Sequence, residues 1–228
     1  MRHPLTRLTN DVPAIRLEPA HTCLILQDVH SPFADGVDGW LARKARDEAL
    51  DREFDEYFET LDLVSGNFPV LAESCRRAGI EVVYACMALS PNPTHTALQE
   101  AMGWTWEVDG PDWRFPDRWQ PADHDHIYVK EGWGALSSSG FTFHLVERAI
   151  HSVIIAGTMY DYGIRQTCYE LADRSIASLV ASDAVVATTN EAGSDTSGNL
   201  AHGLTKLRST SEILDLLDIV KDQGYVLV

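Results

Sequence analysis

Basic residues are scarce in this sequence. Eighteen Lys and Arg stand against 34 Asp and Glu, which gives a formal net charge of −16. Such a chain repels phosphate backbones and anionic lipid headgroups before any specific contact forms, and no local basic patch offsets the repulsion. Long apolar runs are missing too, because stretches such as residues 23–26 and 152–156 fall far short of the roughly 20 residues that cross a bilayer. We therefore expect neither a nucleic acid nor a membrane as a partner.

Cysteine is also sparse. The chain has 228 residues and four widely spaced cysteines without a Cys-x-x-Cys pair, namely Cys23, Cys75, Cys86 and Cys168. This pattern favours reduced, buried thiols over a disulfide framework or a zinc site. The N-terminus has no continuous apolar stretch, so a secretory signal is not expected and we predict a cytoplasmic protein.

What the sequence does contain is an alternation of short apolar runs with amphipathic helical patterns. This order predicts one α/β domain over residues 1–228, with a central parallel sheet covered by helices on both faces. We expect strands at residues 22–27, 81–84, 126–130, 152–156 and 177–182. We expect helices at residues 65–77, 141–149, 163–173, 198–207 and 211–217. The apolar tail, residues 225–228, either pairs as an edge strand or docks on a partner chain.

Two segments depart from this rhythm. Residues 46–62 carry eight acidic and two basic residues around an apolar stripe, which predicts an amphipathic acidic helix that lies on the surface or binds a partner. Residues 103–119 hold four tryptophans with Gly and Pro between them. A loop of this length either covers a substrate or packs its indoles over the end of the sheet.

The candidate chemistry lies at strand ends, because ligands of open parallel sheets collect beyond the carboxyl ends of the strands. Asp28 ends the first strand, Lys130 ends a middle strand, and residues 157–163 form a strand-to-helix turn. A partly desolvated Asp has a raised pKa and can carry a proton, although a nearby Lys acts in the opposite direction. His124 and His126, and likewise Asp28 with His30, have ligand-like spacing but no evident third ligand. We expect no metal and no cofactor.

Several of these motifs resemble one known family. Residues 24–33 are similar to the opening strand of the isochorismatase-like hydrolase superfamily, in which a hydrophobic stretch is followed by Asp-Met-Gln-Asn-Asp-Phe. Lys130 with Ala135 looks like the Lys motif of that family, and residues 182–184 resemble its late Asp-Ala dipeptide. The resemblance covers residues 22–217. It implies a three-layer α/β/α fold with residues 1–21 as an N-terminal extension.

Most members of this superfamily are cysteine hydrolases with an Asp-Lys-Cys triad, whose Cys begins the helix after the fifth strand. A helix N-terminus stabilises a thiolate, and its N–H groups form an oxyanion hole. The resemblance places Gly163 at the nucleophile position, and Cys168 lies more than one turn further along. A glycine here is similar to the isochorismatases proper, which cleave a vinyl ether without a covalent intermediate. Loss of the thiol is expected to enlarge the pocket.

This resemblance implies roles for individual residues. Asp28 would be the acid, Lys130 would orient it, and the backbone N–H groups around Gly163 would hold a carboxylate or a developing anion. Known isochorismatases bring a Gln and an Arg from the segment after the second strand, and neither is present in residues 86–91 of this chain. The candidate substrate-binding residues are Tyr160, Tyr162, Trp104, Trp106, Arg114, His95 and Met87.

The favoured function is therefore hydrolysis of a vinyl ether in a small cyclic metabolite, of the kind found in secondary metabolism. One alternative is hydrolysis of an amide or other C–N bond by water that Asp28 activates. Another is a non-catalytic member that binds a ligand or partner through the Trp-rich loop and the acidic helix. The family commonly forms dimers or tetramers, so a homo-oligomer is expected.

Overall fold

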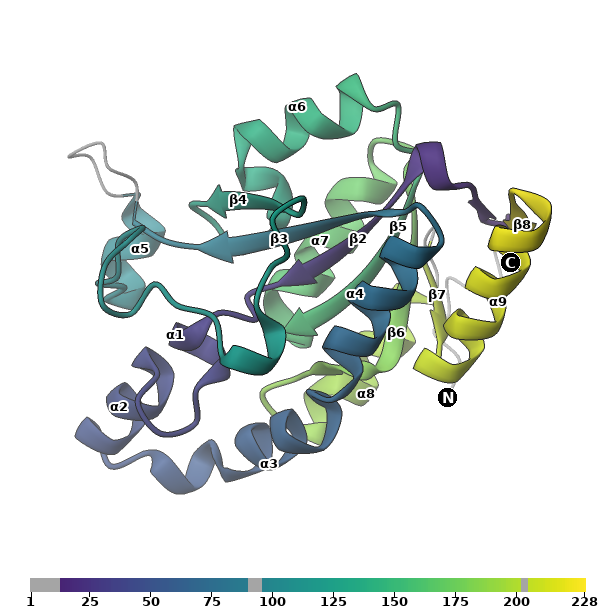
Figure 1. Ribbon diagram of the computed structural model, residues 1–228. Coiled ribbons are helices and arrows are strands. Elements are labelled where there is room, and N and C mark those ends of the chain that lie inside the picture. The colour runs from purple at the N-terminus through teal and green to yellow at the C-terminus, as the bar shows by residue number, and fades with distance from the viewer. Residues whose placement is uncertain (1–12, 90–95, 202–204) are drawn as a thin grey trace.

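A six-stranded sheet lies at the centre of the protein (Figure 1). The computed structural model describes residues 13–89, 96–201 and 205–228. All neighbouring strands of this sheet are parallel. Across the sheet they follow the order β4 (His126–Lys130), β3 (Glu81–Met87), β2 (Thr22–Gln27), β5 (Ser152–Thr158), β6 (Ala177–Val186) and β7 (Thr205–Arg208). The chain moves outward from β2 to β4 and then returns to β5 on the other side of β2. The carboxyl ends of β2 and β5 therefore form the switch point where such sheets bind ligands.

Helices cover both faces of the sheet. One face carries α3 (Asp55–Val64), α4 (Asn67–Arg77) and α9 (Thr210–Gln223). The other carries α6 (Ser139–Glu147), α7 (Arg165–Ala172) and α8 (Asn190–Leu200). Three short helices lie beyond the carboxyl ends of the strands in Figure 1, namely α1 (Ser31–Ala34), α2 (Trp40–Asp47) and α5 (Ala97–Met102). The expected three-layer α/β/α architecture is confirmed.

The central strand β2 shows why its sequence is continuously apolar. Leu24 and Leu26 belong to the hydrophobic core under α4, whereas Cys23 and Ile25 belong to the core under α6 and α7. Successive side chains of a strand point to opposite faces, so a strand covered on both faces needs apolar residues at every position. All six residues of β2 are buried, including Gln27 at its end.

Most predicted elements are confirmed, and β2 and β4 have the predicted bounds. The helix predicted at residues 198–207 is wrong, because α8 ends at Leu200 and residues 205–208 form β7, which pairs with β6. The helix predicted over residues 46–62 is also interrupted. Ala49 adopts φ +56°, which ends α2, and α3 begins only at Asp55. A left-handed residue breaks the i to i−4 ladder whatever the apolar periodicity around it.

The two ends of the described chain meet in a separate ribbon. Within it β1 (Arg16–Leu17) pairs antiparallel with β8 (Val226–Leu227). The pairing continues at Ile15, whose N–H donates to Val228 O at 3.0 Å. The edge-strand alternative for the C-terminal tail is therefore confirmed, with its partner in the same chain. No helix of the described segments is long and apolar enough to cross a membrane.

The Trp-rich loop, residues 103–119, packs over the carboxyl end of the sheet. Trp104, Trp106 and Trp119 are buried, and the backbone of Leu89 donates to Trp106 O at 2.9 Å. The ring of His30 lies 5.1 Å from that of Trp113. Packing accounts for these indoles, and contact of the loop with a substrate stays a prediction.

Candidate active site

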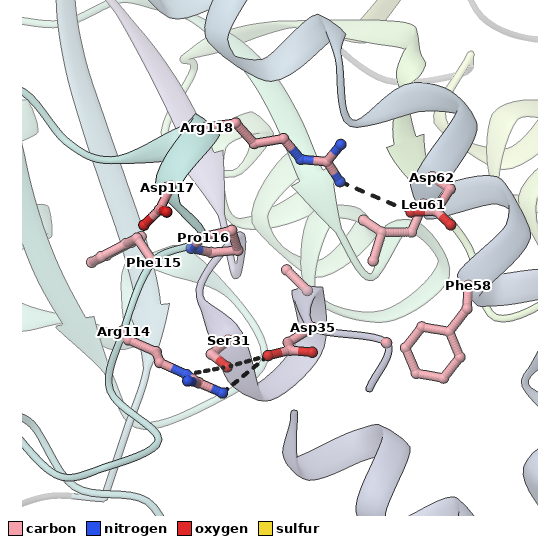
Figure 2. A pocket seen from close by; sticks show the side chains of 12 residues that line it. Ser31, Asp35, Phe58, Leu61, Asp62, Arg114, Phe115, Pro116, Asp117 and Arg118 are labelled. Carbon is pink, nitrogen blue, oxygen red and sulfur yellow. Dashed lines mark hydrogen bonds and ion pairs between the residues drawn. The ribbon is translucent and has the colours of Figure 1, made fainter. Parts of the chain in front are cut away.

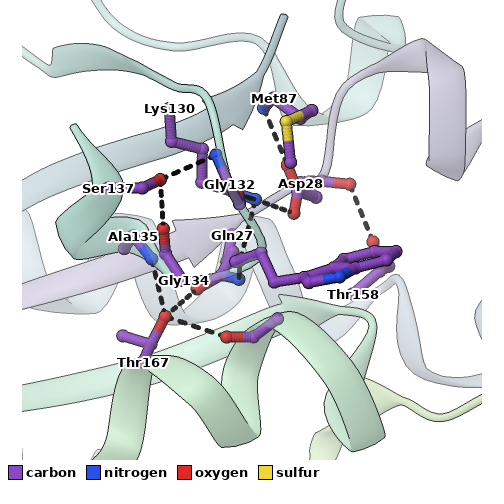
Figure 3. Close-up of polar contacts among 12 residues, drawn as sticks. Gln27, Asp28, Met87, Lys130, Gly132, Gly134, Ala135, Ser137, Thr158 and Thr167 are labelled. Atoms are coloured by element: carbon purple, nitrogen blue, oxygen red, sulfur yellow. Dashed lines mark hydrogen bonds and ion pairs between the residues drawn. The ribbon is translucent and has the colours of Figure 1, made fainter. Parts of the chain in front are cut away.

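Asp28 follows β2 directly and is held by two backbone groups and one side-chain hydroxyl of its neighbours. Its own N–H donates to Ala85 O at 3.0 Å, and the Thr158 hydroxyl donates to its carbonyl at 2.9 Å. Its Oδ1 accepts the Met87 N–H at 2.8 Å (Figure 3). Asp28 adopts φ +50°, a left-handed conformation that Asp tolerates better than most residues. This turn directs the carboxylate across the end of β3.

Lys130 ends β4 and meets the same carboxylate from the other side of β3. Its Nζ lies 2.8 Å from Asp28 Oδ2 and also donates to Trp133 O at 2.9 Å and to Gly132 O at 3.1 Å. These three contacts use all three ammonium donors. The exposed fraction is 0% for Lys130 and 4% for Asp28, so the pair is shielded from solvent screening.

Burial raises the pKa of Asp28 above its usual value. The charge of Lys130, its hydrogen bond and the Met87 N–H all act to lower this pKa, but loss of solvation has the larger effect. The carboxyl therefore takes up a proton more readily than an exposed Asp does. This is the direction that general acid catalysis needs.

Gly163 lies beside this pair in a π-helical turn, Tyr160–Ile164, between β5 and α7. A Cβ built on Gly163 would lie 3.7 Å from Asp28 Oδ2, 2.9 Å from Trp133 O and only 2.4 Å from Gln27 Nε2. The space next to Gly163 is thus filled by the Gln27 amide. The expectation that a missing thiol enlarges the pocket is wrong, because a neighbouring side chain occupies that volume.

Gln27 is fixed in this position by its own hydrogen bonds, which Figure 3 shows. Its Nε2 donates to Trp133 O at 3.1 Å, and its Oε1 accepts from the Thr167 hydroxyl at 2.8 Å. The same hydroxyl lies 2.9 Å from Gly163 O and accepts the Ala135 N–H at 2.8 Å. Gln27 is not among the site residues that the sequence predicts. The signal was a polar residue that ends an otherwise apolar, fully buried strand.

The four cysteines are all buried and free, as expected from their spacing. Burial raises the pKa of Cys75 and of Cys168 to about 12, and it raises those of Cys23 and Cys86 as well. Cys23 is the second residue of β2 and lies five residues before Asp28, about 16 Å away at the rise of a strand. Because the thiolate is the reactive form, burial acts against nucleophilic attack by these thiols.

An apolar cavity of about 370 Å³ is lined by Trp133, while Asp28 and Lys130 are not among its lining residues. We call it the aromatic cavity. Trp133 links it to the pair, because Lys130 and Gln27 both donate to the Trp133 carbonyl. The rings of Trp104 and Tyr162 each lie 5.1 Å from that of Trp133. The other lining residues are Phe33, Trp40, Leu41, Lys44, Ala45, Glu48, Leu50, Phe54, Met102, Met159 and Thr188.

A second cavity of about 410 Å³, the charged cavity, holds Arg114 (Figure 2). Arg114 donates to Asp35 Oδ2 at 3.1 Å and to Ser31 Oγ at 3.2 Å. Arg118 approaches Asp62 at 3.9 Å. The two cavities share no lining residue. Arg114 therefore pairs with Asp35 and lies outside the aromatic cavity.

The structure separates the predicted substrate contacts into groups. Tyr162 and Trp104 line the aromatic cavity. Tyr160 is buried, with its hydroxyl 3.0 Å from Ser197 Oγ, and Trp106 donates its indole N–H to Met87 O. The side chain of Met87 is buried, and it is the backbone N–H of this residue that holds Asp28. His95 lies outside the described residues. The binding roles of all these residues stay predictions.

The histidine motifs do not assemble around Asp28. His30 Nε2 lies 2.8 Å from Met87 O, and burial lowers the pKa of His30 to about 3. Asp125, between His124 and His126, pairs with Arg76. In the described part of the chain one group with metal-ligand chemistry does come together, formed by His126 with Glu81 and His144 at the opposite end of the sheet.

Comparisons with known proteins identify the domain family and the fold. A family model for the isochorismatase domain matches residues 22–212. An uncharacterized isochorismatase family protein, YecD of Escherichia coli O157:H7, is 24% identical over 105 residues, which cover 46% of this chain and 56% of that relative. The match thus spans little more than half the length of the curated relative.

Solved structures match over more of the chain. A cysteine hydrolase from Pseudomonas syringae pv. phaseolicola 1448A has a TM-score of 0.73 at 15% identity, with 92% of this chain and 99% of that chain covered. N-carbamoylsarcosine amidase from Thermoplasma acidophilum has a TM-score of 0.64 at 18% identity, with 83% and 96% covered. At these identities the structural likeness shows the fold.

Proposed function

The chain belongs to the isochorismatase domain family, and from that premise we propose that it is a hydrolase that works by direct acid–base chemistry without a covalent intermediate. One observation carries the proposal. The buried Asp28–Lys130 pair lies beside Gly163, where the volume that a nucleophile would need is filled by the Gln27 amide. The site thus has an acid with a raised pKa, and a glycine stands at the position where the resemblance expects the nucleophile.

Hydrolysis of a vinyl ether uses these groups in a definite order. Protonated Asp28 gives its proton to the terminal methylene carbon, which leaves an oxocarbenium ion. Water adds to the cationic carbon and returns a proton to the Asp28 carboxylate. The resulting hemiketal breaks its C–O bond to give a ketone and an alcohol. The Lys130 ammonium keeps the carboxylate in place and stabilises it while it is ionised.

The aromatic cavity supports a substrate with an apolar ring. Its lining is mostly apolar, and its charged residues Lys44 and Glu48 pair with each other at 2.7 Å. A dicarboxylate needs cationic partners, whereas Arg114 lies in the other cavity against Asp35. We therefore propose a substrate that is less anionic than isochorismate, bound against Trp104, Trp133 and Tyr162.

An amide is also less anionic than a dicarboxylate, so the lack of unpaired cationic side chains along the aromatic cavity favours a second candidate reaction, hydrolysis of a C–N bond. In that reaction ionised Asp28 removes a proton from the attacking water, and N–H groups of the turn at Gly163 bind the developing oxyanion. The two reactions need opposite protonation states of Asp28. Vinyl-ether cleavage should slow as pH rises through the raised pKa of Asp28, whereas C–N cleavage should become faster.

The experiment is a substrate panel assayed with the wild-type protein, Asp28→Asn and the control Asp62→Asn. The panel pairs isochorismate and aryl enolpyruvyl ethers with N-carbamoyl amines and simple amides. Turnover that the Asp28 variant loses and the exposed Asp62 variant keeps supports the proposal, and the pH profile identifies the reaction. Equal turnover by all three proteins removes Asp28 from the mechanism. Binding of panel compounds without turnover would favour the non-catalytic alternative.

A further inference from the structure

A second polar cluster lies at the amino end of the sheet. Glu81 begins β3, His126 begins β4, and His144 lies in α6, which packs against β4. One ligand atom from each of these side chains lies within 4.8 Å of the others. The three residues come from three separate elements, so the fold and not a local sequence motif brings them together.

The cluster contains buried polar atoms that have no hydrogen-bond partner. His144 is only 4% exposed, and neither its Nε2 nor Glu81 Oε2 has a hydrogen-bond partner, although the two atoms lie 3.1 Å apart. The opposite ring nitrogen, Nδ1, lies 3.1 Å from the Tyr128 hydroxyl, which fixes the ring with Nε2 toward Glu81. Buried polar atoms are rarely left unpaired, and a shared cation would satisfy both of these.

From this arrangement we infer that Glu81, His126 and His144 form a binding site for a divalent transition-metal ion, with Zn²⁺ as the best-matched probe. Two imidazoles and one carboxylate make a donor set that suits Zn²⁺ better than Ca²⁺ or Mg²⁺. Around a tetrahedral ion with bonds of about 2.0 Å, ligand atoms lie roughly 3.3 Å apart. His144 Nε2 and Glu81 Oε2, 3.1 Å apart, already have nearly this spacing, and His126 closes the site by a shift of at most about 1.5 Å.

Neighbouring residues contact two of the three ligand side chains and orient them, as hydrogen-bond partners of metal ligands commonly do. The Tyr128 hydroxyl supports His144 through the nitrogen that does not bind the ion. Arg148 lies 3.2 Å from Glu81 Oε1 and leaves Oε2 for the ion. Glu81 and His126 are partly exposed and His144 is buried, so the cluster lies at the edge of the core.

This site is separate from the proposed hydrolytic centre. Glu81 and Met87 are the two ends of β3, which puts about 20 Å between the cluster and the backbone N–H that holds Asp28. A bound ion would tie α6 to β3 and β4 and would act on stability. The inference therefore does not depend on which bond the enzyme cleaves.

Calorimetric titration of the chelator-treated full chain with Zn²⁺ tests the inference. We expect one ion per chain with a micromolar or tighter Kd. His126→Ala and Glu81→Gln should each weaken binding at least tenfold, whereas His124→Ala, an exposed histidine two residues away, should stay within twofold of wild type. Zn²⁺ should also raise the melting temperature of the wild type and of His124→Ala but not of the two ligand variants.

Both ligand variants are chosen to fold, because His126 is partly exposed on the edge strand and Gln has the shape of Glu. Circular dichroism checks this. Co²⁺ gives an independent readout, since a four-coordinate site should produce strong visible absorption that His126→Ala loses. Absence of Zn²⁺ binding, or equal binding by wild type, His126→Ala and Glu81→Gln, would overturn the inference.

Discussion

Substitution of Gly163 by Ala tests whether the Gln27 amide fills the space next to Gly163. The new methyl group would lie 2.4 Å from Gln27 Nε2 and 2.9 Å from the backbone oxygen of Trp133. The Gln27 amide cannot move without loss of its hydrogen bonds to Trp133 O and Thr167. Overpacking of this kind costs about 1–3 kcal/mol, which corresponds to a fall in Tm of several degrees for a domain of this size.

The matched control is Gly198→Ala in α8, where a Cβ meets nothing within 4 Å. Replacement of a helical Gly by Ala at an open position stabilises by roughly 0.5–1 kcal/mol. Urea or thermal unfolding should thus move in opposite directions for the two variants. The double variant Gln27→Ala with Gly163→Ala should be more stable than the sum of the single effects predicts. A Gly163→Ala protein as stable as Gly198→Ala would refute the idea that Gln27 fills this position.

Three further predictions concern the site and its surroundings. Asp28→Asn should lower kcat by about 10²–10⁴-fold. For vinyl-ether cleavage, steady-state kinetics across pH should show the wild-type rate falling as pH rises through the raised pKa of Asp28. Because burial lowers the pKa of His30 to about 3, the unfolded chain binds a proton at His30 at a higher pH than the native protein does. The free energy of unfolding should therefore fall as pH drops from about 6.5 toward 3, by at most ~1.4 kcal/mol per pH unit, and urea unfolding of His30→Gln should show a shallower loss. Tyr162→Ala should raise KM about tenfold, whereas Tyr169→Ala, of similar exposure at 43% against 45% and outside the aromatic cavity, should leave KM near the wild-type value.

The parallel sheet was predictable because its strands are short, apolar and separated by amphipathic patterns. Residues 22–27 are covered by helices on both faces, so hydrophobicity alone marks that strand. The helix predicted at residues 198–207 was wrong because hydrophobicity alone does not mark the elements in that region. Helix α8 depends on its Thr189 cap and on Leu200 at its buried end more than on a strong apolar stripe, and β7 is too short to show a period.

The candidate site was predictable only in part. Asp28, Lys130 and Gly163 were found from strand ends and from motif resemblance, and the structure brings them together. The roles of Gln27 and Trp133 were not foreseen, because they depend on a side-chain amide and a backbone carbonyl that meet across 106 residues of sequence. The cluster of Glu81, His126 and His144 was hidden for the same reason, since tertiary packing alone brings these three residues together.

The most direct test of direct hydrolysis is the intact mass of the protein, acid-quenched at steady state with the best substrate of the panel. We predict the unmodified mass at every time point, because water attacks the substrate without a bond to the enzyme. An adduct of substrate mass on Cys23, Cys75, Cys86 or Cys168 would contradict the account.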